Sequence, residues 1–166
     1  MAARRDPPLP SQIVLDASEI LSSRGYEVES AIAEERLTQL DSLDTKNTLY
    51  LLKSYTDLSL SLAGVLHARG ARLLNPYPSS AAARNKIISC QYLRAGGIPS
   101  PRSWVTGDMS LLLPLVVDTP LIVKPCMGWR GIGVKVVRTP EDVKALPVPE
   151  GPMLIQEFLK GTGEDL

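Results

Sequence analysis

Residues 121–137 read LIVKPCMGWRGIGVKVV, in which two apolar runs flank a glycine-rich segment. Lys124 ends the first run, and Gly128, Gly131 and Gly133 precede the second. Short apolar runs bounded by Pro and Gly predict two strands joined by a loop. The loop is not a GxxxxGK[ST] phosphate loop, because its lysine precedes the glycines and follows a strand, and it is not a GxGxxG turn either.

Two interpretations of this loop carry equal weight on the sequence alone. Glycine lets backbone amides approach an anion without a Cβ in the way, and Lys124 would add a positive charge beside them, so the loop is able to bind phosphate. The alternative is a plain β-hairpin whose loop uses glycine for its positive φ angles.

The C-terminal part of the chain is β-rich around this stretch. Thr139 and Pro140 predict the start of one helix, with Glu141 and Asp142 placed to suit its dipole. Together these elements predict a small antiparallel sheet with a helix, an α+β unit. The expected strands are residues 102–105, 121–124, 134–138 and 153–158.

The N-terminal part alternates helix and strand, as a parallel α/β unit does. Helical spacing predicts a helix over residues 10–21, and Asp57 is the expected N-cap of a second helix that ends at Gly70. The expected strands are residues 26–29, 48–52 and 72–74.

A third helix connects the two parts. It is expected to begin at Ser79 or Ser80 and to end at Gly96, and the prolines at 99 and 101 mark a junction. We therefore expect an α/β domain over residues 1–78, a connecting helix over 79–98 and an α+β subdomain over 99–166.

Composition limits the classes of partner. The 166 residues are 44% hydrophobic and 22% charged, as in an ordinary folded domain. Lys plus Arg and Asp plus Glu number 18 each, so no basic excess favours nucleic acid or an anionic membrane. The longest apolar run, residues 111–117, is too short to span a bilayer.

The cysteines and the N-terminus predict a cytoplasmic protein. Cys90 and Cys126 have no disulfide or zinc spacing and are expected to be reduced, and the single His67 cannot complete a histidine metal cluster. Arg4 and Arg5 are followed by prolines instead of the apolar region that a signal peptide needs.

Three segments taken in order resemble the ATP-grasp superfamily, most closely the ribosomal-protein glutamate ligases and the lysine-biosynthesis ligases. They are RNKIISCQYLRAGGIPSPRSW (84–104), PLIVKPCMGWRGIGVKVV (120–137) and MLIQEFLKGTGEDL (153–166). The resemblance implies an α/β fold with a parallel pre-ATP-grasp domain that lacks its first strand. The first α+β subdomain of the grasp follows, and the C-terminal half of the grasp is absent.

The resemblance also implies roles for named residues. Lys86 and Lys124 would contact the nucleotide phosphates, and the loop of Gly128, Gly131 and Gly133 would close over them. The backbone of Gln156, Glu157 and Phe158 would bind the adenine edge beside Ile122, and Asp165 would bind the ribose. Taken without the resemblance, Lys86, Glu157 and Asp165 are ordinary surface charges. Arg130 is either a phosphate or carboxylate ligand or an exposed loop cation, with equal weight.

The activity that the resemblance implies is an ATP-dependent carboxylate–amine ligation through an acyl phosphate. Its cofactors would be ATP and Mg²⁺, with the metal ligands beyond residue 166, so neither a metal ligand nor a catalytic residue is assigned and the chain alone is expected to be inactive. The partners would be small-molecule or peptide carboxylates and amines, with homo-oligomers left open. The alternatives are a non-catalytic nucleotide-binding or scaffold module of the same fold and, more simply, a domain without a ligand.

Overall fold

The computed structural model describes residues 12–54, 56–128 and 131–161, and the chain divides into two compact units, Met1–Tyr77 and Pro78–Leu166. Within the described residues no helix is both long and apolar enough to cross a bilayer.

The first unit is built on a pair of parallel strands, as expected. Strands β1 (Leu49–Leu51) and β2 (Arg72–Leu74) pair in parallel, and α2 (Asp57–Ala68) connects them. Leu60, Ala63 and Leu66 of α2 are buried. The remaining elements are α1 (Gln12–Ser23) and the 3₁₀ turns η1 (Ala33–Glu35) and η2 (Leu40–Ser42).

Two expectations for this unit are wrong. The N-cap of α2 is Thr56, whose side chain accepts from the Ser59 amide, so Asp57 becomes the first helical residue and faces the positive end of the helix dipole. Residues 26–29 form no strand. Glu29 instead forms an ion pair with Arg36, and Tyr26 is exposed, so this segment does not join the sheet.

The expected connecting helix is two helices, α3 (Tyr77–Arg84) and α4 (Lys86–Ala95). The break falls at Asn85, which has an extended backbone and accepts from the amides of Ile87 and Ile88. An asparagine that caps a helix in this way competes with continuation of the preceding one. As a result, Lys86 is the first residue of α4 rather than part of a helix interior.

The second unit contains the antiparallel sheet that the sequence predicts. Its order is β3-β6-β4-β5, with β3 at Ser103–Thr106, β6 at Met153–Glu157, β4 at Leu121–Pro125 and β5 at Lys135–Val137. Every neighbouring pair is antiparallel. The mixed α/β architecture, with one parallel and one antiparallel sheet, confirms the predicted fold class.

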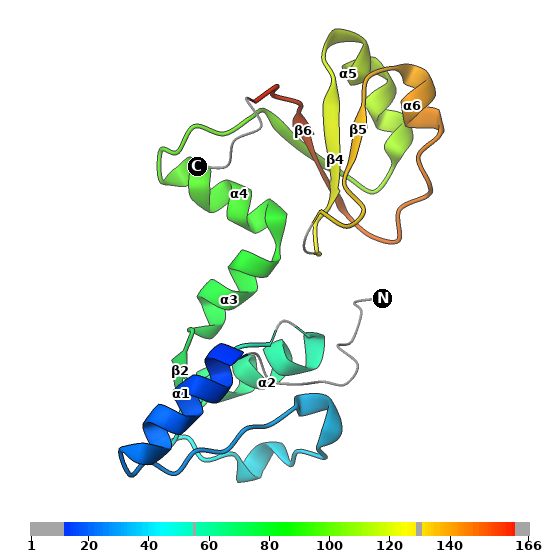
Figure 1. Cartoon of the computed structure of the whole chain (residues 1–166). Helices are drawn as coiled ribbons and strands as arrows, with labels where there is room; N and C mark the ends of the chain where they lie inside the picture. The colour runs from blue at the N-terminus through cyan, green and yellow to red at the C-terminus, as the bar shows by residue number, and fades with distance from the viewer. Residues whose placement is uncertain (1–11, 55, 129–130, 162–166) are drawn as a thin grey trace. The chain divides into compact units, whose positions relative to one another are not determined.

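Helices cover one face of this sheet (Figure 1). The 3₁₀ turn η3 (Met109–Leu112), α5 (Leu113–Asp118) and α6 (Pro140–Lys144) pack on one face, and the buried cluster there contains Leu112, Val116, Val143, Leu121, Val123, Val137 and Ile155. Because side chains alternate along a strand, Lys124 and Gln156 lie on the other face, toward α4.

The helix α6 begins as predicted, and α5 was not predicted. Thr139 caps α6 through a capping box with Asp142. Helix α5 begins within the apolar run of residues 111–117 and ends just after it, at Asp118. Pro114 of this run occupies the first turn of the helix, where a missing N–H costs nothing.

Candidate functional site

Lys86 connects the start of α4 to the segment that follows β4 through two hydrogen bonds. Its backbone N–H donates to the Cys126 carbonyl at 2.9 Å, and its Nζ donates to the Gly128 carbonyl at 3.0 Å. The fold therefore brings the lysine of one predicted segment onto the first glycine of another, 42 residues away in sequence.

Lys124 lies on β4, half-buried, and its Nζ donates to Gln156 Oε1 at 2.8 Å. Burial lowers the pKa of the Lys124 amine, and the Lys86 ammonium lowers it further, while Cys90 acts in the opposite direction. The two positive charges thus repel each other. Such a pair attracts an anion.

Neither ammonium is paired with a carboxylate in the described part of the chain. Arg36–Glu29 and Arg102–Glu157 are ion pairs there, and neither includes Lys86 or Lys124. Two positive groups without a counter-charge favour a bound anion of higher charge, such as a polyphosphate.

The glycines of this segment adopt the positive φ angles that the sequence predicts. Gly128 and Gly133 have φ angles of +131° and +74°. A Cβ on Gly133 would lie 2.8 Å from Pro125 Cγ, so this position excludes larger residues by contact as well as by backbone conformation.

We expect Gly133→Ala to lower the free energy of unfolding by about 2 kcal/mol, because it adds a steric overlap to the cost of a left-handed alanine. Gly151→Ala is the matched control, since its added Cβ would meet nothing within 4 Å. Urea unfolding of both variants measures the difference. Equal stabilities would show that neither the contact with Pro125 nor the left-handed backbone at residue 133 has a cost.

Two backbone N–H groups at the end of β6 already have hydrogen-bond acceptors. The Glu157 amide donates to the Arg102 carbonyl at 3.1 Å, and the Phe158 amide donates to the Pro120 carbonyl at 2.8 Å. These two N–H groups are therefore not free to donate to a nucleobase. A donor for an adenine edge would have to come from a neighbouring amide.

The side chains of these two residues pair with arginines. Glu157 forms an ion pair with Arg102 at 2.7 Å, and this hydrogen bond holds the pKa of the Glu157 carboxyl below its ordinary value. The Arg138 guanidinium lies 5.7 Å from the centroid of the Phe158 ring, a cation–π contact. The Glu157 side chain is thus paired with the residue that directly precedes β3.

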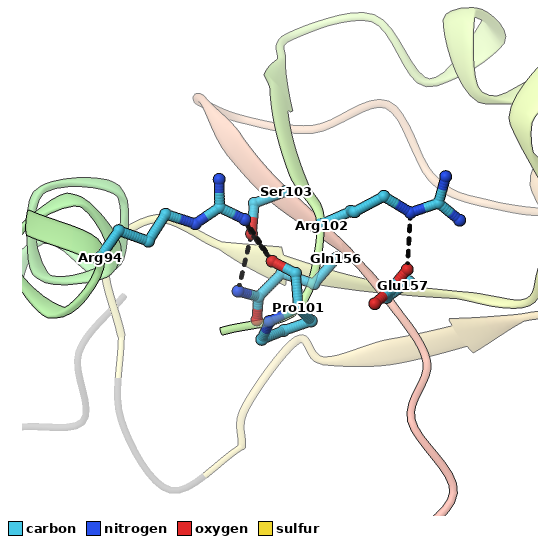
Figure 2. A network of polar contacts seen from close by, with 6 residues as sticks. All are labelled: Arg94, Pro101, Arg102, Ser103, Gln156 and Glu157. Carbon is cyan, nitrogen blue, oxygen red and sulfur yellow. Dashed lines mark hydrogen bonds and ion pairs between the residues drawn. The ribbon is translucent and has the colours of Figure 1, made fainter. Parts of the chain in front are cut away.

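The Gln156 side chain lies at the centre of a polar cluster shown in Figure 2. It is 8% exposed, and its Nε2 donates to Ser103 Oγ at 3.0 Å and toward Cys90 Sγ at 3.8 Å. Ser103 and Arg94 were not predicted as part of any site. These contacts span 53 and 66 residues of sequence, and no local pattern indicates them.

The structure therefore brings four of the predicted residues together, namely Lys86, Lys124, Gly128 and Gln156. Glu157 and Phe158 directly follow Gln156 in the chain. Arg130 and Asp165 lie outside the described residues. Both cysteines are free thiols, as expected.

No family model matches the chain, but relatives and solved structures similar to it are known. A ribosomal protein bS6–L-glutamate ligase of Escherichia fergusonii is 32% identical over 124 residues, which make up 65% of this chain and 40% of that protein. The chain thus spans about two fifths of the length of this relative.

Solved structures share the fold. A RimK domain ATP-grasp protein from Sphaerobacter thermophilus superposes with a TM-score of 0.73 at 18% identity, over 96% of this chain and 63% of that one. The ATP-grasp ligase PsnB, solved with a variant of its minimal precursor, Mg and ADP, gives a TM-score of 0.54 at 20% identity, over 91% and 63%. The chain thus shares the fold of these ATP-grasp proteins, and part of its sequence is similar to that of the bS6 glutamate ligase.

Proposed function

We propose that this chain forms the phosphate-binding part of an ATP-dependent carboxylate–amine ligase. The observation that carries the proposal is a pair of ammonium groups that have no carboxylate partner in the described residues. Lys86 Nζ donates to the Gly128 carbonyl, Lys124 Nζ donates to Gln156, and the charge of Lys86 acts on Lys124. Relatives of this chain are glutamate ligases, and the PsnB ligase binds ADP and Mg, which supports the same nucleotide here.

In this proposal the two lysines bind the phosphates from two elements. Lys86 approaches from the start of α4 and Lys124 from β4, so their charges act on the anion from different directions. The Gly128 to Gly133 loop would fold over the phosphates with its amides as further donors. Arg130 is proposed as an additional phosphate or carboxylate ligand.

The adenine would lie beside the end of β6, near the half-buried Ile122. Because the amides of Glu157 and Phe158 donate to the residues that directly precede β3 and β4, we assign the adenine donor to the Leu159 amide and the acceptor to a carbonyl of residues 156–158. Asp165 keeps its proposed role as the ribose ligand.

The chemistry we propose is transfer of the ATP γ-phosphoryl group to a substrate carboxylate, followed by attack of an amine on the acyl phosphate and loss of phosphate. The lysines would stabilise charge on the transferred group. The acceptor would be a small molecule or a peptide, since one relative acts on ribosomal protein bS6.

Magnesium is not assigned to any residue. Among the described residues no group of three or more His, Cys, Asp or Glu is placed to hold a metal ion, so we derive no step through the metal. For the same reason no catalytic residue is named, and we propose that residues 1–166 alone bind nucleotide without turnover. The proposed compartment is the cytoplasm, where ATP is available and the free thiols stay reduced.

The experiment that tests the proposal is calorimetric titration of the chain with ATP. Lys124→Met should weaken ATP binding about tenfold or more, because it removes a charged donor from the phosphates. Lys144→Met, an exposed lysine on α6, is the control and should bind as the unmodified chain does. Failure of the unmodified chain to bind ATP, or equal affinity of the two variants, would contradict the proposal.

A further inference from the structure

We propose that the side chain of Gln156 is a positioning residue: it holds the Lys124 ammonium toward the nucleotide phosphates through a hydrogen-bond network that contains no counter-charge. This inference rests on the proposed function and extends it, because the role given to Gln156 so far concerns its backbone alone.

The orientation of the Gln156 amide follows from the chemistry of its neighbours. An ammonium group only donates hydrogen bonds, so the atom 2.8 Å from Lys124 Nζ must be the carbonyl oxygen Oε1. The NH₂ group then faces Ser103 Oγ and Cys90 Sγ, which accept its two hydrogens. A flipped amide would point its hydrogens at the lysine.

Ser103 fixes this orientation from the other side. Its hydroxyl donates to the Pro101 carbonyl at 2.9 Å and accepts from Gln156 Nε2 at 3.0 Å and from Arg94 Nη2 at 3.2 Å. A hydroxyl has one donor and two acceptor positions, so all of them are filled. Arg94 also donates to the Pro101 carbonyl, which ties the network to α4 (Figure 2).

The burial of Gln156 makes this arrangement costly to break. At 8% exposure, rotation of the amide would leave buried polar atoms without partners, which costs about 1–3 kcal/mol per group. Every buried side-chain nitrogen and oxygen in the described residues has a partner. The Lys124 ammonium is therefore held by the Gln156 side-chain carbonyl, whose orientation on β6 is fixed.

The network leaves the charge of Lys124 available. Gln156 occupies one of its three N–H donors, and the titratable groups that act on it are Lys86 and Cys90, both on α4. A carboxylate in place of the Gln156 amide would form an ion pair with Lys124 and cancel the charge that phosphate requires. The neutral amide positions the ammonium without that loss.

The first test needs no nucleotide. In a ¹³C-labelled chain, the Cε shift of Lys124, assigned with Lys124→Arg, is followed against pH in Gln156→Glu and Gln156→Met. The glutamate variant should raise the pKa of Lys124 by adding an opposite charge, and the methionine variant should lower it by removing the acceptor. General loosening of the site would move both variants toward the ordinary lysine value, so opposite shifts are specific to positioning.

The second test is ATP titration of the same variants. Gln156→Glu should weaken binding about tenfold and Gln156→Met several-fold. The exposed Gln91 of α4 supplies the controls, Gln91→Glu and Gln91→Met, which should leave both the Lys124 titration and ATP affinity unchanged.

The two proposals fail in different ways. If the unmodified chain binds ATP and the Gln156 variants bind equally well with an unchanged Lys124 titration, the positioning role is wrong and the proposed function stands. If the Lys124 shifts are opposite but the unmodified chain binds no ATP, the proposed function is wrong, and the phosphate as the target of Lys124 is wrong with it.

Discussion

Lys86→Glu is expected to weaken ATP binding at least about a hundredfold while the chain stays folded. The charge of residue 86 already acts on Lys124, so a carboxylate there would attract the Lys124 ammonium in place of repelling it. The same carboxylate would repel phosphate, so one substitution weakens the contribution of both lysines. Each charged donor to a phosphate contributes about tenfold or more, which gives the expected loss.

The position of Lys86 separates lost binding from lost stability. It is the first residue of α4, and an acidic side chain in the first turn is favoured by the helix dipole. The backbone hydrogen bond from residue 86 to the Cys126 carbonyl does not depend on the side chain. The variant should therefore unfold in urea at a concentration close to that of the unmodified chain.

A control of equal net charge completes this experiment. Lys144→Glu changes the overall charge of the chain by the same amount but at an exposed site on α6, and calorimetry should show unchanged ATP affinity. If both variants lost affinity equally, the effect would be one of net charge, and Lys86 would have no special place in the site.

The sequence predicted the parts of this site that depend on local patterns. Lys124 and the glycines lie in a strand–loop–strand pattern, which the two apolar runs and the glycine-rich segment between them predict. The parallel pair and the antiparallel sheet follow from runs of β-forming residues separated by turns and helices. The roles of Lys86 and Gln156 came from the family resemblance, because neither residue stands out in its own segment.

What the sequence did not predict depends on tertiary contacts or on single caps. The sequence did not predict that the helix is interrupted at Asn85, because apolar residues at helical spacing continue across α3 and α4. The Gln156–Ser103 contact joins adjacent strands whose pairing register no local pattern specifies. Glu157, taken without the resemblance, was interpreted as an ordinary surface charge, and the same strand pairing brings it into an ion pair with Arg102.

Leu112→Ala is expected to lower the free energy of unfolding of residues 78–166 by about 3 kcal/mol. Leu112 is 1% exposed and belongs to the buried cluster between η3, the two short helices and the sheet. Removing most of a buried leucine side chain costs about 2–5 kcal/mol, from lost burial and the cavity that remains. Urea unfolding followed by tryptophan fluorescence measures the loss, since Trp104 and Trp129 both belong to residues 78–166.

The neighbouring Leu111 is the matched control, because it has the same side chain in the same turn but is 60% exposed. Leu111→Ala should cost less than about 0.5 kcal/mol. Equal losses would mean that η3 does not face the sheet as described. Leu112 packs on the face opposite Lys124 and Gln156, so the folded fraction of Leu112→Ala should still bind ATP with unchanged affinity. Loss of stability without loss of affinity would separate the hydrophobic scaffold from the polar site on the other side of the same sheet.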